Sequence, residues 1–517
     1  MPLARALSVA LVGVEGHLVE VEADLAQGLP GLTLIGLPDA SLHEARDRVR
    51  AAVVNSGESW PQRRITLGLS PASLPKRGSG FDLAMAAAIL AAAAALPLRA
   101  LAGLLLLGEL GLDGRVRPVR GVLPAVLAAA ATGVERAVVP QANLAEARLV
   151  PGISVVGVGS LRALVALLRG QLPPQVEEDD AGPVSAVSTD RGSGVLSLGL
   201  DLGDIVGQAH GRWAVEVAAA GGHHLYLWGP PGAGKTMLAE RLPGLLPALD
   251  MDAALEVTAV HSVAGSLPGA GPLITRPPYR DPHHTASVSA LVGGGSGLAR
   301  PGEVSLAHRG VLFLDEAPEF HGGVLDALRQ PLERGEVTIA RSGGTARFPA
   351  RFLLVLAANP CPCAQVSGAA DRCTCSALAR RRYLSRLSGP LLDRIDLHVE
   401  LFQVSRAELL CDRSSVEGSA AVADRVLAAR GRARARLAGT PWRTNAELPG
   451  RELRARWAPQ AGALRQAEAA LERGQLSARG LDRVLRVAWT LADLAGRGRP
   501  AAADVDGALF LRLTAAA

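Results

Sequence analysis

Residues 223–236 read HHLYLWGPPGAGKT, and this stretch decides the fold of the middle of the chain. An apolar run at 225–228 leads into the pattern Gly-x4-Gly-Lys-Thr, and a helical pattern, MLAERLPGLL, follows. A strand, a glycine-rich loop and a helix in this order form a P-loop, whose backbone N–H groups surround a phosphate. In such a loop the lysine reaches phosphate oxygens and the threonine hydroxyl ligates Mg²⁺. The sequence therefore predicts a nucleotide site at Gly229, Pro230, Pro231, Gly232, Ala233, Gly234, Lys235 and Thr236.

The lysine content favours this interpretation over a glycine-rich turn that matches by chance. Among 54 basic residues, only Lys76 and Lys235 are lysine. A compact ammonium fits inside a tight phosphate loop, whereas a planar guanidinium does not. One of the two lysines thus occupies the position at which phosphate binding requires it.

Two later apolar runs end in polar residues that suit phosphate chemistry. The run 311–314 ends in Asp315 and Glu316, and the run 353–357 is followed by Asn359, one of only four asparagines. Beside a P-loop, we expect Asp315 to hold Mg²⁺ through water and Glu316 to orient or deprotonate the attacking water. We expect Asn359 to sense the γ-phosphate or that water. The alternatives are solvated acids at a strand edge and an asparagine in an ordinary turn before Pro360.

Composition limits the remaining possibilities. The 517 residues suggest about three domains at about 150 residues each. Apolar residues make up 49% and the net charge is +5, which excludes global disorder and a histone-like charge pattern. Five cysteines are too few for a disulfide scaffold, which favours a reducing cytoplasm, and we identify no export signal. The longest apolar run, 83–98, is shorter than the roughly 18 residues that span a membrane and predicts a buried helix.

Four regions follow one another along the chain. Residues 1–170 mix strand-like runs with alanine-rich helices and predict an α+β domain. Residues 171–195 combine Pro, Gly, Ser and acidic residues and predict a linker. Residues 196–405 alternate short apolar strands with helices and predict an α/β domain with a parallel sheet. Residues 406–517 are rich in Ala, Leu, Arg and Glu and predict helices only.

With these elements in place, the chain resembles the AAA+ ATPases, most closely the magnesium-chelatase-like branch of the ComM or YifB type. The stretches that carry the resemblance are GQAHGRWAVEVAAAGGHHLYLWGPPGAGKTML, RDPHHTASVSALVGGG, RPGEVSLAHRGVLFLDEAPEF, GEVTIARSGGTARFPARFLLVLAANPCPC and LSGPLLDRIDLHVE. The resemblance implies a P-loop AAA+ core with a helical lid, and a ring, usually a hexamer, with ATP and Mg²⁺ between subunits.

The resemblance also implies roles for four further residues. The neighbouring subunit would supply Arg394, in LLDRID, to the γ-phosphate, and Arg479, in the helical lid, would contact the nucleotide. Gly207 and Gln208 match the segment that packs on the adenine side. From the residues alone, Arg394 between two aspartates is equally consistent with a local ion pair.

Two insertions mark this branch. In GEVTIARSGGTARFPARF, alternating apolar residues and Gly343-Gly344 predict a hairpin. We expect Arg341 and Arg347 to flank its tip and to contact DNA phosphates. The alternative is a solvated hairpin tip without a DNA contact. The other insertion, at about 278–295, contains Asp281, His283 and His284. Adjacent histidines can bind metal, but with one nearby acid we favour a structural or pore-loop role.

Four cysteines follow the third strand in two Cys-x-Cys pairs. Such a group can hold a structural Zn²⁺, although a single intervening residue is a tighter spacing than usual, and free thiols in a polar loop are the alternative. We assign ordinary packing to Cys411. The candidate zinc ligands are Cys361, Cys363, Cys373 and Cys375.

The N-terminal region looks like the proteolytic domain of Lon-type enzymes, which has the ribosomal S5-type fold. The matching stretches are TLGLSPASLPKRGSGFDLAMAAAIL and LLLLGELGLDGRVRPVRGVLPAVLAAAA. Those enzymes use a Ser–Lys dyad. Ser79 would take the nucleophile's position, but Leu123 and Pro124 stand where the lysine would fall, so we predict a non-proteolytic scaffold. We expect Lys76 at the surface.

The resemblance implies an ATP-driven ring motor acting on branched or single-stranded DNA. Its expected role is branch migration, as a helicase, in homologous recombination during natural transformation. The alternative is a protein-remodelling or chelatase-type ATPase without a DNA substrate. Chelatase motor subunits lack a Lon-like domain, which weighs against that alternative. An ATP-dependent protease would need another base.

Overall fold

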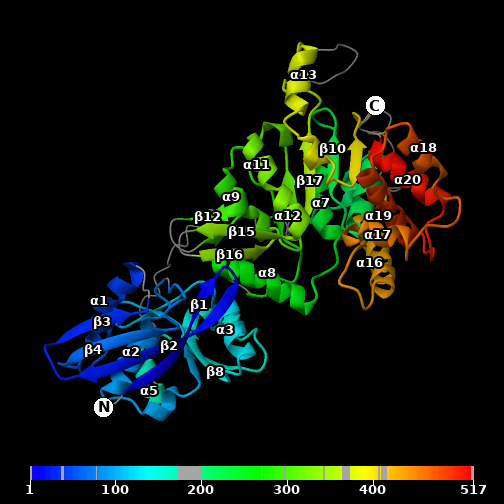
Figure 1. Ribbon diagram of the computed structural model, residues 1–517. Coiled ribbons are helices and arrows are strands. Elements are labelled where there is room, and N and C mark those ends of the chain that lie inside the picture. The colour runs from blue at the N-terminus through cyan, green and yellow to red at the C-terminus, as the bar shows by residue number, and fades with distance from the viewer. Residues whose placement is uncertain are drawn as a thin grey trace.

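The computed structural model describes residues 3–36, 40–76, 78–172, 199–268, 271–295, 299–341, 344–363, 373–405, 408 and 416–513, without the side chains of 40–43 and 341. Most of the predicted linker, residues 342–343 of the predicted hairpin and Cys411 lie outside these residues. An N-terminal lobe packs beneath a larger α/β core with a helical domain beside it (Figure 1). The predicted mixed α/β fold is confirmed.

The N-terminal lobe is built on a seven-stranded sheet in the order β3-β4-β2-β1-β5-β8-β9. Along β2, buried Val19, Val21, Ala23 and Leu25 alternate with more exposed residues, because one face of the strand packs on the core. Helix α2 is buried at every position, as predicted for the apolar run that begins at Leu83. The strands are β1 (Ala4–Val12), β2 (Glu15–Ala26), β3 (Gly31–Ile35), β4 (Arg64–Ser70), β5 (Leu104–Leu106), β8 (Arg136–Pro140) and β9 (Ser154–Val158), with a small hairpin of β6 (Glu109–Leu110) and β7 (Val116–Arg117). The helices are α1 (Ala40–Asn55), α2 (Asp82–Ala92), α3 (Val122–Ala131), α4 (Leu144–Ala147) and α5 (Leu161–Leu168).

The core domain contains a five-stranded parallel sheet in the order β11-β14-β17-β10-β18. Its strands are β10 (Leu225–Trp228), β11 (Tyr279–Arg280), β14 (Val311–Leu314), β17 (Leu353–Ala358) and β18 (Leu397–Glu400). All residues of β14 and β17 are buried, because helices cover both faces. Trp228 pairs with Ala358 and Leu314 pairs with Leu356, so the carboxyl ends of β10, β14 and β17 meet at one edge.

Different helices cover the two faces of this sheet. Leu227, Phe313 and Val355 face α6, α7 and the helical domain. Leu312, Leu314 and Leu356 face the opposite cluster, which includes the hairpin β15–β16. The helices of the core are α6 (Ala209–Gly221), α7 (Lys235–Leu245), α8 (Met251–Ala264), α9 (Val288–Val292), α10 (Glu303–Leu306), α11 (Gly322–Ala327), α12 (Arg329–Arg334), α13 (Ala377–Leu384) and α14 (Gly389–Leu392). Two hairpins are formed by β12 (Gly293–Gly294) with β13 (Arg300–Pro301) and by β15 (Glu336–Arg341) with β16 (Gly344–Pro349).

The C-terminal domain is helical in the described residues 416–513, as predicted. Its helices are α16 (Ser419–Arg436), α17 (Gly450–Arg454), α18 (Arg465–Glu472), α19 (Ala478–Leu494) and α20 (Ala502–Leu513). A buried ionic cluster ties it to the core, where Asp396 contacts Arg483 at 3.0 Å and His223 at 3.4 Å. Burial opposes ionisation of Asp396, but Arg483 and His223 hold the pKa of this carboxyl well below its ordinary value.

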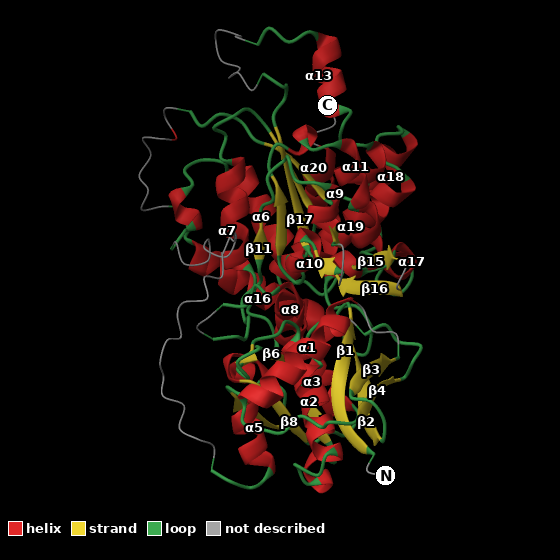
Figure 2. Ribbon diagram, turned by 90° about the vertical axis from the view of Figure 1, so that its left-hand side faces the viewer, coloured by secondary structure: helices red, strands yellow, loops and turns green. Residues whose placement is uncertain are grey.

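The N-terminal lobe contacts the core through α8 and the hairpin β15–β16, in an arrangement visible in Figure 2. Ala259 of α8 belongs to the same apolar cluster as Val126 of α3. In the turn between β1 and β2, Gly13 has φ +68°, and a Cβ there would lie 2.4 Å from the carbonyl oxygen of Arg347 in β16. This close approach requires glycine. No helix in the described parts of the chain has the length and apolar character needed to cross a membrane.

Candidate ATP site at the edge of the parallel sheet

The P-loop follows β10 and leads into α7, and glycine is required where it passes close to other backbone. A Cβ at Gly229 would lie 2.3 Å from the carbonyl oxygen of Leu401. Gly234, which caps α7, has φ +85°, a left-handed conformation that other residues rarely adopt. The loop can therefore curl tightly ahead of the helix and direct backbone N–H groups at an anion.

Lys235 lies at the centre of the site. Its ammonium donates to the carbonyl oxygens of Gly229 at 2.7 Å and Pro230 at 2.9 Å, and to Oδ1 of Asn359 at 2.9 Å. Burial lowers the pKa of Lys235, and the nearby carboxylates of Asp315 and Glu316 oppose this shift. The P-loop lysine and the asparagine after β17 are thus brought together, although 124 positions separate them.

Thr236 and Asp315 form the part of the site that fits Mg²⁺. The Thr236 hydroxyl donates to Oδ2 of Asp315 at 2.8 Å, and Oδ1 of Asp315 accepts from the backbone N–H of Glu316 at 2.8 Å. A hydroxyl and a carboxylate are hard oxygen ligands, which Mg²⁺ prefers. A P-loop with these two oxygens beside it has the donor set that a Mg²⁺–nucleotide requires.

Glu316 begins a short 3-10 turn and has an unexpected partner. Its φ of +49° places it in the left-handed region. Oε2 of Glu316 lies 3.4 Å from Nδ1 of His284, which belongs to the insertion at 278–295. No sequence pattern indicates this contact, because the two residues belong to separate motifs. His283 instead contacts the Thr285 hydroxyl at 2.9 Å.

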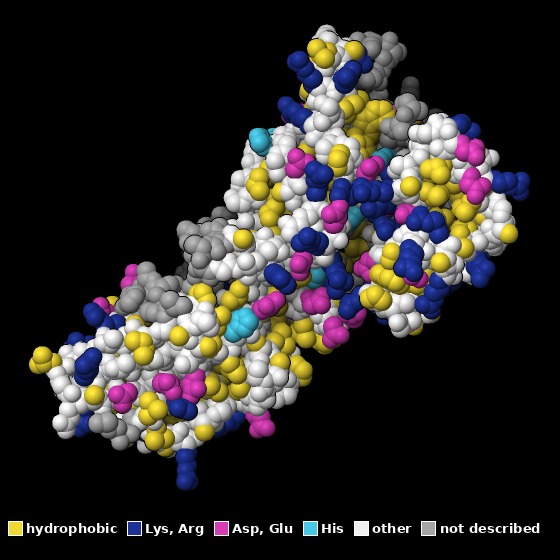
Figure 3. All heavy atoms as spheres, in the orientation of Figure 1, with side chains coloured by type: hydrophobic (Ala, Val, Ile, Leu, Met, Phe, Trp, Pro, Cys, Tyr) yellow, Lys and Arg dark blue, Asp and Glu magenta, His cyan; other side chains and the backbone are white. Residues whose placement is uncertain are grey.

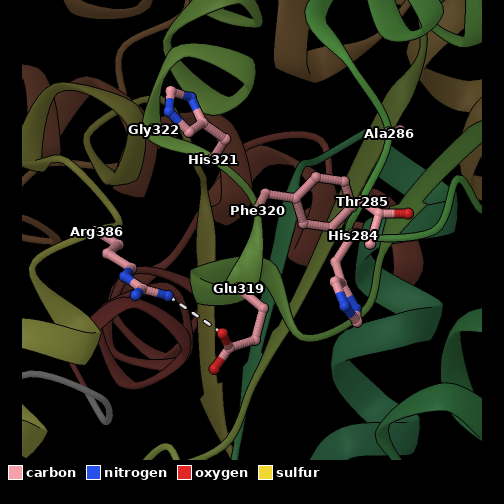
Figure 4. A pocket seen from close by; sticks show the side chains of 8 residues that line it. All are labelled: His284, Thr285, Ala286, Glu319, Phe320, His321, Gly322 and Arg386. Atoms are coloured by element: carbon pink, nitrogen blue, oxygen red, sulfur yellow. Dashed lines mark hydrogen bonds and ion pairs between the residues drawn. The ribbon is translucent and has the colours of Figure 1, made fainter.

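A cavity of about 400 Å³ lies beside this contact. His284, Thr285 and Ala286 line one side, and residues 319–322 line the other (Figure 4). Arg386 donates to the Glu319 carboxylate across it at 3.2 Å. In the described residues the adjacent histidines belong to no group of three metal-ligating side chains.

Arg394 and Arg479 lie apart from the P-loop, in a groove between the core and the helical domain. The groove has a volume of about 1170 Å³. Arg483 and Glu333 also line it, whereas no residue of the P-loop does. The structure therefore does not bring Arg394 or Arg479 to the P-loop of the same chain.

Arg394 is held by a residue that the sequence did not identify. Its guanidinium pairs with Glu333 and donates to the carbonyl oxygen of Pro390, rather than pairing with an adjacent aspartate. Its Nε is buried and has no hydrogen-bond partner among the described residues. Burial and the neighbouring cations Arg329, Arg479 and Arg483 lower the pKa of Arg394. A cation in this setting would gain strongly from a phosphate.

Gly207 and Gln208 precede α6 close to the end of β18. Their φ angles are +67° and +52°. The Gln208 amide donates to the carbonyl oxygen of Phe402, which is one residue beyond the Leu401 carbonyl against which the P-loop packs. These residues and the P-loop thus share one edge of the domain.

The predicted hairpin forms, but Arg347 does not lie at its tip. Arg341 pairs with Gly344, next to the turn, and its side chain lies outside the described residues. Arg347 pairs with Thr338, three positions farther from the turn, because Val337 and Phe348 pack into the core and set the register. Its side chain is exposed. The prediction that both arginines flank the tip is therefore wrong for Arg347.

The four cysteines come together. Their Sγ atoms all lie within 4.8 Å of one another. Three of the separations are 3.2, 3.5 and 3.6 Å, close to the edge of about 3.8 Å that four thiolates form around Zn²⁺ and far longer than a disulfide of about 2.05 Å. The group can hold a metal ion.

In the described part of the N-terminal lobe, the predicted position holds no Ser–Lys pair. Ser79 donates to the Glu109 carboxylate, and Leu123 is fully buried in α3. Lys76 is also fully buried and donates to the carbonyl oxygen of Pro71, so the expectation of a surface position is wrong. Burial lowers the pKa of Lys76.

Comparisons with known proteins agree with this arrangement. Three family descriptions match: magnesium chelatase subunit ChlI at 201–409, subunit ChlI of Mg-chelatase at 21–143, and the ChlI C-terminal region at 416–512. An uncharacterized protein of Mycobacterium tuberculosis is 56% identical over the whole of both chains. Competence protein ComM of Haemophilus influenzae is 42% identical over 96% of this chain and 94% of its own length. Lon protease of Mycolicibacterium smegmatis is 30% identical over 34% of this chain and 23% of its own length.

The chain belongs to the ComM/YifB-type family of magnesium-chelatase-like AAA+ ATPases. Its N-terminal part is similar to Lon protease. ATP and Mg²⁺ are the cofactors that this family implies, and the P-loop, Thr236 and Asp315 provide the groups to hold them. When bound, Mg²⁺ would polarise the phosphate oxygens.

Proposed function

We propose that this protein is an ATP-hydrolysing ring motor that acts on branched or single-stranded DNA, as a branch-migration helicase in homologous recombination during natural transformation. One observation carries the proposal: the P-loop site and the groove with Arg394 and Arg479 are separate in one chain. A site that needs both is complete only when a neighbouring copy supplies the arginines. Head-to-tail contacts of this kind close into rings, which supports a homo-hexamer.

In the proposed mechanism each site residue has a distinct role. The P-loop and Lys235 bind the phosphates, Thr236 and Asp315 hold Mg²⁺, and Gly207 and Gln208 lie on the adenine side. Glu316 accepts a proton from the attacking water or orients it, and Asn359 contacts the γ-phosphate or that water. Arg394 and Arg479 of the adjacent subunit neutralise charge that develops on the transferred phosphate.

The DNA substrate is the finer part of the proposal. Similarity over most of the chain to a competence protein supports it, as do the exposed Arg347 and the neighbouring Arg341 on the hairpin β15–β16. We also propose that residues 1–170, 171–195, 196–405 and 406–517 form the lobe, linker, core and lid, and that the lobe is a non-proteolytic scaffold. Its direct contact with the hairpin at Gly13 supports a structural role.

We further propose that Cys361, Cys363, Cys373 and Cys375 bind one structural Zn²⁺. The near-tetrahedral spacing of their Sγ atoms supports this assignment. Metal analysis of the purified protein should find about one zinc per chain by this stoichiometry. A Cys361→Ser and Cys373→Ser variant should lose it, and undiminished zinc in that variant would contradict the assignment.

The alternative is a protein-remodelling or chelatase-type ATPase without a DNA substrate, which the match to magnesium chelatase subunits favours. Steady-state ATPase assays with and without a four-way DNA junction distinguish the two, with Lys235→Ala as the control for contaminating activity. The proposal predicts stimulation by the junction and its ATP-dependent unwinding. Hydrolysis that no DNA stimulates would favour the alternative.

A further inference from the structure

Helix α13 forms an arm that projects beyond the rest of the core domain. Both ribbon views show it at the far end of the molecule from the N-terminal lobe (Figures 1 and 2). The arm follows the cysteine cluster directly, since Cys375 lies two residues before α13 begins at Ala377. It leads into α14 and then to Arg394. The arm thus lies in the chain between Asn359, which follows β17, and Arg394 in the groove.

The surface of this arm is basic. Its sequence, ALARRRYL, contains Arg380, Arg381 and Arg382, all of them exposed. Arg380 donates to the carbonyl oxygen of Cys375 at 3.3 Å. Among the described residues no carboxylate pairs with Arg381 or Arg382. Figure 3 shows Lys and Arg side chains on both sides of the projecting tip.

The arm is held at both of its ends. Tyr383 is buried, with 4% of its surface exposed, and the Ser376 hydroxyl caps α13 by accepting from the N–H of Ala379 at 3.2 Å. Cys373 and Cys375 lie just before this cap and belong to the four-cysteine cluster. The arginines therefore project from an anchored helix.

The angular spread of the three arginines around α13 favours one class of partner. Consecutive residues on an α-helix are about 100° apart, so three in a row spread over about 200° of its circumference. A membrane-bound helix would gather apolar residues on one face, whereas only Leu378, 57% exposed, is a large exposed apolar residue on α13. Guanidinium groups that are spread around a projecting helix are complementary in charge to the phosphates of a nucleic acid.

We propose that α13 is a DNA-binding arm in which Arg381 and Arg382 bind backbone phosphates and the four-cysteine cluster fixes the N-terminal end of the helix. The inference rests on the proposed DNA motor and adds a second contact region, separate from the hairpin β15–β16. Because the contacts are to phosphates, the arm binds without regard to base sequence. It also binds more weakly as salt concentration rises.

The test compares two variants of the full chain that each lose two exposed arginines. Arg381→Ala with Arg382→Ala removes the arm's charges, and Arg465→Ala with Arg473→Ala removes the same charge from the α18 surface. Binding of labelled single-stranded and four-way DNA is measured over a series of salt concentrations. For the arm variant we expect weaker binding to both DNAs and a slope of log affinity against log salt smaller by about 1.4 to 1.8. The α18 variant should bind as the wild type does.

A second variant tests the anchor. Cys373→Ser with Cys375→Ser should weaken DNA binding in the same direction while nucleotide binding at the distant P-loop persists. Wild-type DNA affinity in the arm variant would overturn the inference and leave the proposed motor intact. A wild-type protein that binds no DNA would overturn both. Arm-dependent binding to phosphatidylglycerol vesicles with unchanged DNA binding would also overturn the inference.

Discussion

Replacement of Arg394 by alanine should abolish hydrolysis while leaving ATP binding intact. In one chain the arginine contacts Glu333 and the carbonyl oxygen of Pro390 and does not reach the P-loop. The residues that we propose to contact the nucleotide in that chain, Lys235 and Thr236, are therefore undisturbed. The substitution removes only the guanidinium group that Arg394 would supply to the ATP site of the neighbouring subunit.

The substitution of Arg394 should affect the rate of ATP hydrolysis far more than the stability of the fold. The lost pair with Glu333, whose side chain is 57% exposed, contributes at most about 1 kcal/mol to folding. An arginine that neutralises charge on a transferred phosphoryl group accelerates hydrolysis by about 10³ to 10⁵. Turnover should fall by that factor while thermal unfolding changes little.

The assay pairs steady-state ATP turnover with equilibrium binding of a fluorescent ATP analogue. Glu333→Ala is the matched control, because it breaks the same ion pair but retains Arg394, and it should keep wild-type turnover within a few-fold. Full turnover in Arg394→Ala would refute the assignment. Loss of analogue binding would show instead that the arginine shapes the site of its own chain.

Three further predictions follow from the site and the core. Lys235→Ala should abolish ATP hydrolysis and weaken ATP binding, because it removes the cation that would contact the phosphates. The same two assays measure both effects, and retained turnover would exclude the P-loop assignment. His284→Ala should raise DNA-independent turnover by up to about five-fold by releasing Glu316, and a fall would make His284 a positioning residue. His283→Ala breaks the contact with Thr285 and removes the ring that lies 4.1 Å from the ring of His284, but it leaves the partner of Glu316 in place and should raise turnover less. Burial lowers the pKa of His224 from 6.5 to about 4. Between these pH values the unfolded chain binds more protons than the folded chain, so the free energy of unfolding should fall by about 3 kcal/mol as the pH drops from 6.5 to 4. Thermal unfolding at pH 7 and pH 5 checks this, and a His224→Gln variant should show a smaller loss.

The sequence predicted those parts of the site in which phosphate binding requires particular residue types within a short motif. The strands before the P-loop and Asp315 begin and end where predicted, and Asn359 meets Lys235, because parallel strands bring their carboxyl ends to one edge. These features depend on motifs only a few residues long.

Long-range packing decided what the sequence could not predict. His284 reaches Glu316 only because the insertion folds back over the end of β14. Arg347 lies away from the hairpin tip because buried Val337 and Phe348 set the register. Lys76 is buried despite its charge, since its ammonium finds the carbonyl oxygen of Pro71. The contact of His284 and the register of Arg347 therefore have no local signature, whereas Lys76 contacts a residue only five positions earlier.

The shared ATP site is tested most directly by mixing two inactive variants. Lys235→Ala retains Arg394, and Arg394→Ala retains the P-loop, so some interfaces of a mixed ring combine an intact P-loop with an intact arginine. Random assembly at equal amounts gives such interfaces at about a quarter of all positions in a head-to-tail ring. We predict that the mixture recovers about that fraction of wild-type ATP turnover. A mixture that remains as inactive as its components would contradict a site completed by the neighbouring subunit.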